Sequence, residues 1–103
     1  MSVRWMRTAL IGNGKFMEAI AWGKETAAYG EKKFGMPKIH MWVDIFGKTG
    51  TIRWTTDYPD LATLEKAQSI MMGDQDYWKR VTKAVGDGLF IEGSVEDHVF
   101  REV

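Results

Sequence analysis

Hydrophobic and polar positions follow two different periods along the chain, and these periods separate predicted helices from predicted strands. From 15 to 34, apolar and small residues recur at three- and four-residue steps in a stripe without charges, which predicts a helix with one buried side. A second helical pattern starts after Asp60, the expected N-cap, and is interrupted at Gly73. Asp74 is expected to cap a further short helix, which ends at the glycines near 86–88.

Four other stretches are typical of β-strands, because they are rich in apolar and β-compatible residues and bounded by turn signals. They are residues 3–11, 38–46, 51–57 and 89–103. The Gly-Lys-Thr-Gly segment at 47–50 lies between the second and third stretches and predicts a hairpin with a four-residue loop. In the last stretch, Leu89 and Ile91 alternate with Phe90 and Glu92, which predicts that these two pairs lie on opposite faces of the sheet.

The hairpin loop also predicts which strand residues lie opposite each other. The predicted cross-strand pairs are Asp44 with Arg53, Trp42 with Thr55, and His40 with Asp57. The opposite side of the hairpin then carries the apolar set, including Ile52 and Trp54, for helices to cover. A slip of one residue would destroy this segregation, so we prefer this register.

The predicted order βαββαβ favours an α+β domain of the ferredoxin-like type. Such a domain has a four-stranded antiparallel sheet with its helices on one face. A length of 103 residues is enough for one hydrophobic core and too short for two, so residues 1–103 are expected to form a single domain.

The sheet face away from the helices, which we call the open face, is predicted to be unusually apolar. It would expose Trp42, Phe46, Phe90 and Phe100 to water, more apolar surface than a monomer of this size usually leaves uncovered. We therefore expect a homodimer that covers this face. The last stretch, 89–103, is long for one strand and is expected to reach the partner subunit.

Charge and composition exclude several classes of function. Fourteen Lys and Arg residues balance fourteen Asp and Glu residues, so no net field favours nucleic acid. The absence of Cys removes thiolate nucleophiles and Cys-type metal sites, and two His residues offer little for a metal. The short apolar run at 9–11 is too short for a signal peptide. We expect a cytoplasmic protein with no metal, no cofactor and neither nucleic acid nor membrane as partner.

The stretch Gly73-Asp74-Gln75-Asp76-Tyr77-Trp78, which leads through Gly88-Leu89-Phe90-Ile91-Glu92-Gly93-Ser94 into the final strand, resembles the dimeric α+β barrel superfamily. The resemblance covers almost the whole chain in element order and is strongest to NIPSNAP-like and antibiotic-biosynthesis-monooxygenase-like members. It implies two subunits packed sheet against sheet around a lumen. The superfamily includes cofactor-independent oxygenases, haem-degrading enzymes, isomerases, dehydratases and members with no known activity.

The haem-degrading branch of this superfamily combines an Asn in the first strand with a His on the second long helix. The only Asn of this chain is Asn13, in a predicted turn, and residues 61–85 contain no His. Haem chemistry is therefore not expected.

The resemblance implies that the polar side chains of the open face line the lumen. The candidates are His40, Asp44 and Arg53 for catalysis and Trp42, Thr55, Phe90 and Glu92 for ligand binding. His40 would act as a general base oriented by Asp57, and Arg53 would hold a carboxylate or enolate oxygen. Cross-strand pairing explains these same residues without catalysis.

Two hypotheses about function follow. In the first, the chain is a cofactor-independent monooxygenase or isomerase that binds a small aromatic or carboxylated metabolite in its lumen. In the second, it is a non-catalytic ligand-binding or structural dimer.

Overall fold

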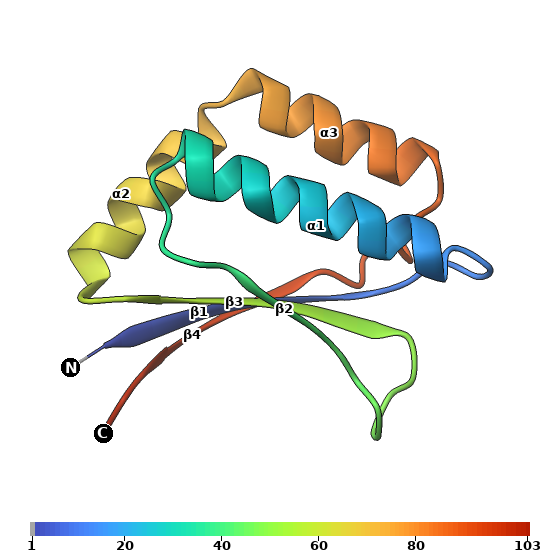
Figure 1. The fold of residues 1–103 in the computed structure, drawn as a ribbon, viewed down its shortest axis with the longest axis horizontal. Coiled ribbons are helices and arrows are strands. Elements are labelled where there is room, and N and C mark those ends of the chain that lie inside the picture. Colours follow the sequence, from blue (N-terminus) through green and yellow to red (C-terminus); the bar gives the residue numbers. More distant parts are fainter. Residues whose placement is uncertain (1) are drawn as a thin grey trace.

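The computed structural model describes residues 2–103 as one antiparallel sheet with all helices on one face (Figure 1). The elements are β1 Val3–Leu10, α1 Phe16–Lys33, β2 His40–Val43, β3 Thr51–Tyr58, α2 Leu61–Met72, α3 Gln75–Gly86 and β4 Glu96–Arg101. The strand order is β2-β3-β1-β4. The predicted ferredoxin-like α+β fold is confirmed, including the interruption of the second helical region between α2 and α3.

The core lies between the sheet and the helices. Alternate residues of the two central strands point into it, so that Trp5 of β1 and Trp54 of β3 are 5% and 7% exposed. Ile52 is fully buried beside them, as the apolar side of the predicted hairpin requires. None of the helices described in residues 2–103 is long and apolar enough to cross a membrane.

The predicted hairpin register is wrong by two residues. Trp42 lies opposite Arg53 and His40 lies opposite Thr55, because β2 ends at Val43 and the loop is longer than four residues. A shift of two residues preserves the alternation of faces. His40, Trp42, Arg53 and Thr55 therefore still share the open face, although their partners differ.

The prediction of one continuous strand over 89–103 is also wrong, because a turn separates Phe90 from β4. The Ser94 backbone N–H and its side-chain Oγ both donate to the Ile91 carbonyl oxygen, at 3.2 and 2.6 Å. Gly93 has a φ of 77°, a conformation that residues with a side chain rarely adopt. The turn changes the side on which alternate residues lie, so Phe90 packs among core residues under the helices. The predicted placement of Phe90 on the open face is therefore wrong.

Candidate functional site

The open face brings together most of the predicted site residues. Arg53 and Asp44 form a two-bond pair, with Nε to Oδ1 at 2.8 Å and Nη2 to Oδ2 at 3.0 Å. Hydrogen bonds from Arg53 hold the pKa of the Asp44 carboxyl below its usual value. The expected ion pair is thus present, and Nη1 of Arg53 also donates to the Met6 sulfur at 3.7 Å, so two of the five N–H groups remain for a ligand.

Trp42 and His40 extend this cluster along β2. The Trp42 indole N–H donates to the Thr55 hydroxyl at 2.9 Å, and the His40 and Trp42 rings lie 6.1 Å apart. Asp57 does not orient His40, because it accepts two hydrogen bonds from Arg4, at 2.7 and 3.1 Å. The predicted His40–Asp57 pair is therefore wrong.

A shallow hollow of about 340 Å³ lies on the open face beside Arg53. Its wall includes Lys48, Glu96 and His98, so both signs of charge are represented. Among the described residues, no cluster of three or more His, Asp or Glu side chains has a geometry that could hold a metal ion.

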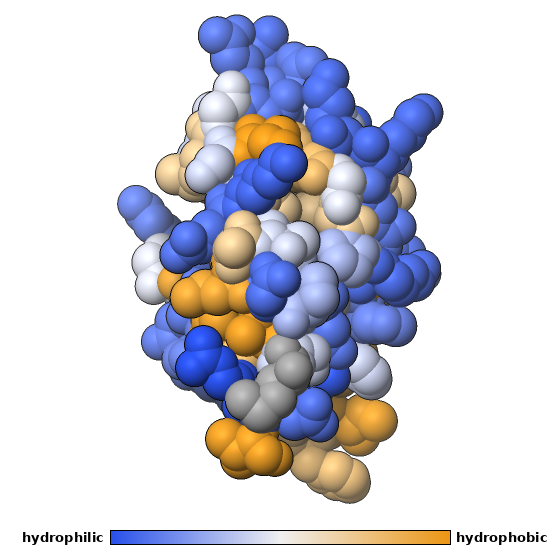
Figure 2. Space-filling model, turned by 90° about the vertical axis from the view of Figure 1, so that its left-hand side faces the viewer, coloured by the Kyte–Doolittle hydropathy of each residue, from blue (hydrophilic) through white to orange (hydrophobic). Residues whose placement is uncertain are grey.

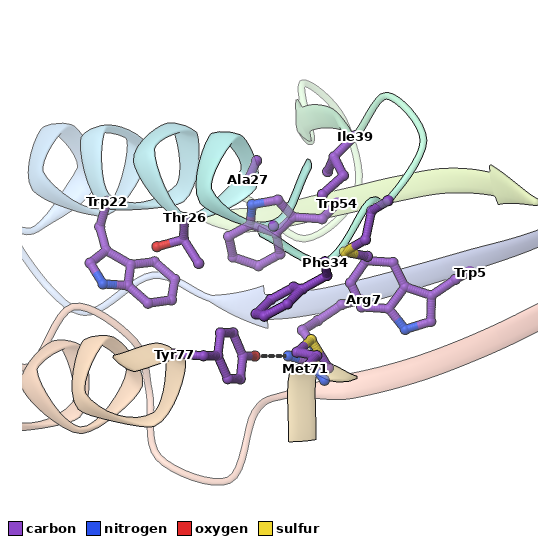
Figure 3. Close-up of a pocket in the computed structure, with 12 residues that line it drawn as sticks. Trp5, Arg7, Trp22, Thr26, Ala27, Phe34, Ile39, Trp54, Met71 and Tyr77 are labelled. Carbon is purple, nitrogen blue, oxygen red and sulfur yellow. Dashed lines mark hydrogen bonds between the residues drawn. The ribbon is translucent and has the colours of Figure 1, made fainter. Parts of the chain in front are cut away.

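Phe90 and Glu92 belong to a different hollow, on the helix side of the sheet. This outer groove, of about 550 Å³, lies between α3 and the sheet and is lined by residues of α3 and by most of the segment from Gly88 to Val95. A smaller inner cavity of about 60 Å³ lies beneath α1 (Figure 3). The walls of both hollows share four residues: Arg7, Trp22, Trp54 and Tyr77.

Among the described residues, Arg7 is the only charged one in the wall of the inner cavity. It extends from β1 under the helices, and its Nε and Nη2 donate to the Asp97 carboxylate at 2.7 and 2.8 Å. Its Nη1 donates to the Tyr77 hydroxyl at 2.8 Å, which joins the sheet to α3 (Figure 3). Burial lowers the pKa of Arg7, but the bonds to Asp97 and Tyr77 outweigh it and raise the pKa above its usual value.

Several polar groups around the Arg7 guanidinium can form further hydrogen bonds. A guanidinium has five N–H groups, and the bonds to Asp97 and Tyr77 use three of those on Arg7. Thr26 Oγ1 and Trp5 Nε1, which belong to residues of the inner cavity wall, are buried without a partner among the described residues. Tyr77 accepts from Arg7, so its own proton can be donated elsewhere. The site therefore offers mainly donors, which suits a ligand with oxygen acceptors.

Sequence reasoning missed Arg7, Trp22 and Tyr77 as site residues. Tyr77 and Trp22 have the spacing of ordinary core residues, so the sequence holds no signal that distinguishes a site residue from a packing residue at these positions. Arg7 carried a signal, since it alternates with Trp5 and Ala9 on the buried side of β1. A charged residue at a core position requires a partner or a function.

No protein-family model matches this chain, and no curated protein matches it either. Solved structures do match its fold. A NIPSNAP family protein from Agrobacterium tumefaciens superposes with a TM-score of 0.80 at 16% identity, covering 100% of this chain and 94% of that one. An uncharacterized NIPSNAP-like domain protein from Burkholderia xenovorans gives 0.79 at 11% identity, over 99% and 85% of the two chains.

A further match is SnoaB, a cofactor-independent oxygenase from Streptomyces nogalater. It gives a TM-score of 0.69 at 13% identity, with coverage of 98% of this chain and 92% of that one. These identities establish a shared fold and no more. The expected resemblance to the NIPSNAP-like and monooxygenase-like α+β fold is confirmed.

Proposed function

We propose that this chain binds a small, flat, mainly apolar molecule that carries an anionic or carbonyl oxygen, in the outer groove between α3 and the sheet. One observation carries the proposal. The Arg7 guanidinium, with two N–H groups to spare, lies where the groove meets the inner cavity, among the rings of Trp22, Trp54 and Tyr77. Apolar walls with a few convergent polar groups are the usual composition of a small-molecule site.

Arg7 is suited to this task because its position is fixed before a ligand arrives. Asp97 holds it through two parallel hydrogen bonds, and Arg7 lies 5.4 Å from the Trp5 ring centroid. A charge-assisted bond from a fixed, partly desolvated guanidinium is stronger than one from a mobile surface side chain. An oxyanion at this point would be stabilised without rearrangement of the protein.

The activity that we propose for this pocket is cofactor-independent oxygenation or isomerisation. When either reaction begins by removing a proton beside a carbonyl, it generates an enolate oxygen that Arg7 and the Tyr77 hydroxyl would stabilise. SnoaB, a cofactor-independent oxygenase, has a similar fold. Glu92 is a carboxylate in the groove wall and our candidate for the base. The alternative is a non-catalytic ligand-binding dimer, which would use the same pocket without turnover, or a structural dimer, whose open face would serve only as its interface.

The open face is our proposed dimer interface and the second candidate for a ligand site. Trp42 and Phe100 are 54% and 45% exposed on it, an apolar surface that a second copy of the chain would cover. Arg53 would then lie in the lumen between the two sheets, with Nη1 directed at a carboxylated ligand. The hollow beside Arg53 carries charges of both signs and lacks the aromatic rings that surround Arg7, which makes this the weaker of the two sites.

A matched pair of variants can distinguish the two candidate ligand sites. Arg7 and Arg53 lie on opposite faces of the sheet, and each forms an ion pair with an Asp. Binding of 2-naphthoate, an aromatic carboxylate, is measured by calorimetry for the wild type, Arg7→Met and Arg53→Met. We expect Arg7→Met to weaken binding by about tenfold or more, since a hydrogen bond to a charged group is worth about 1.5–3 kcal/mol. Arg53→Met should stay within about twofold.

A loss of affinity confined to Arg53→Met would show that the ligand binds on the open face and not in the outer groove. If neither variant changed the affinity, or if the wild type did not bind, the proposed function would be wrong. Thermal unfolding of each variant confirms that the comparison is between folded proteins.

A further inference from the structure

The backbone around Phe90 is tied to the end of β1. Phe90 forms an isolated bridge with Ile11. On either side of Phe90, the Gly12 N–H donates to the Leu89 carbonyl and the Ile91 N–H donates to the Leu10 carbonyl, both at 2.8 Å. The position from which the ring projects is therefore fixed by the sheet.

The Phe90 ring meets two indoles edge to face. It lies 5.3 Å from the Trp22 ring and 6.0 Å from the Trp54 ring, with interplanar angles of 68° and 66°. Trp22 and Trp54 line both the outer groove and the inner cavity, whereas Phe90 lines only the groove. Phe90 thus forms the part of the groove wall that packs edge to face against the two indoles.

The two indoles have polar anchors. The Trp22 N–H donates to the Arg80 carbonyl at 3.2 Å, and the Trp54 N–H donates to the Gly23 carbonyl at 3.4 Å. Phe90 has no polar atom in its side chain. Its ring can be removed without breaking a hydrogen bond, which would leave an aromatic recess in front of Trp22 and Trp54.

We propose that Phe90 determines the size of the ring system that the outer groove accepts, by occupying the place that one more ring would take against Trp22 and Trp54. This inference rests on the proposed function, because it concerns the same pocket. The part of a longer ligand that Phe90 excludes from the groove remains in water, so the apolar surface of that part contributes no binding free energy. Phe90 is accordingly a specificity residue and takes no part in holding the ligand oxygen.

The test compares two carboxylates that differ by one fused ring, 2-naphthoate and 2-anthroate. Affinities for both are measured by calorimetry with the wild type and with Phe90→Ala. We expect Phe90→Ala to raise the affinity for 2-anthroate relative to 2-naphthoate by about tenfold, because the third ring enters the recess and contacts both indoles. Phe90→Trp, which enlarges the obstruction, should weaken binding of both acids.

Ile91→Ala is the matched control. Ile91 is the next residue, lines the groove and is 42% exposed, but its aliphatic side chain has no ring to pack against the indoles. It should leave the ratio of the two affinities unchanged. Phe90→Leu keeps a side chain in the site and replaces Phe90→Ala should that variant unfold; it should move the ratio in the same direction by a smaller factor.

The outcomes separate the two proposals. If 2-naphthoate binds in an Arg7-dependent way and Phe90→Ala leaves the affinity ratio unchanged, the role of Phe90 is wrong and the pocket stands. If the ratio changes equally in Ile91→Ala, the effect belongs to the whole groove wall and not to Phe90. If the wild type binds neither acid, both proposals are wrong.

Discussion

At the scale of single residues, the buried polar groups of the core are of two kinds, those with hydrogen-bond partners and those without. Arg7 donates to a carboxylate and a hydroxyl and lies over an aromatic ring, and two of its five N–H groups have no partner among the described residues. Tyr58 is only 1% exposed, and its hydroxyl finds no partner among the described residues. Burial raises the pKa of Tyr58 to about 12. A buried hydroxyl without a partner loses its hydration and gains nothing in return.

Tyr58→Phe should therefore stabilise the protein. Removing an unsatisfied buried hydroxyl is expected to raise the free energy of unfolding by about 1 kcal/mol at neutral pH. Denaturant unfolding followed by tryptophan fluorescence measures this difference. A loss of stability greater than about 1 kcal/mol would show that the hydroxyl has a partner in solution.

The same variant changes the response to alkali. In the wild type, the unfolded Tyr58 ionises near its ordinary pKa of about 10 and the folded one only near 12. This ionisation leaves the free energy of unfolding unchanged below pH 10 and lowers it as pH rises towards 12, by about 3 kcal/mol in total, because the unfolded chain loses the proton first. Tyr58→Phe should lack this part of the decline.

At the scale of elements, α3 depends on a cap that also connects it to α1. Asp74 Oδ2 accepts from the Tyr77 backbone N–H at 2.9 Å and from the Tyr29 hydroxyl at 2.6 Å. The bond from Tyr29 is the main reason that the pKa of Asp74 lies below its usual value. Asp60, the cap of α2, has only local partners, the N–H and hydroxyl of Thr63.

Asp74→Ala should cost more stability than Asp60→Ala. Loss of a helix cap costs about 1 kcal/mol, and Asp74→Ala also leaves the Tyr29 hydroxyl without its acceptor. Because folding lowers the pKa of Asp74, its stabilisation is present above pH 4 or so and is lost as pH falls through the folded pKa. Urea unfolding at pH 7 and pH 3 measures both effects. Equal losses for the two variants at pH 7 would contradict the role of the Tyr29 bond.

Elements also show how far the sequence predicts this structure. The helices follow from apolar stripes and Asp caps, and the shared face of Trp42 and Arg53 follows from alternation, which a two-residue shift in register does not alter. The length of the hairpin loop was not predictable, because several turns suit the same glycines. Phe90 was misplaced because Gly93 and Ser94 fit an alternating strand as well as the turn that they form.

At the scale of the whole molecule, the sheet curves away from the helices, and the β2–β3 hairpin extends beyond it (Figure 1). Ile45 and Phe46 in the hairpin loop are 83% and 92% exposed. Figure 2 shows hydrophobic groups at the lower end of the molecule, the end away from the helices. Exposed apolar side chains thus occur both on the open face, at Trp42, and in the hairpin loop, and the proposed dimer would cover both.

Trp42→Glu should weaken the proposed dimer. A charge in the centre of an apolar interface must be desolvated without a partner, so we expect the dissociation constant to rise by about tenfold or more. Ile70→Glu, at a 45% exposed position of α2 on the opposite side of the sheet, is the control and should have no effect. Sedimentation equilibrium measures the association. A wild-type chain that is monomeric at micromolar concentration would remove the basis for the lumen.

The strand order has a consequence for how the chain is completed during translation. Central strand β1 pairs with β4, the last strand of the chain, from Val3 with Arg101 to Thr8 with Glu96. One edge of β1 therefore stays unpaired until residues 96–101 have been synthesised, and until then Arg7 lacks its partner Asp97. Contacts between such distant segments close large loops and form slowly. A nascent chain that has left the ribosome only as far as α3 contains the Arg7 guanidinium but not the Asp97 carboxylate that pairs with it. Its core is therefore completed only after β4 has been synthesised.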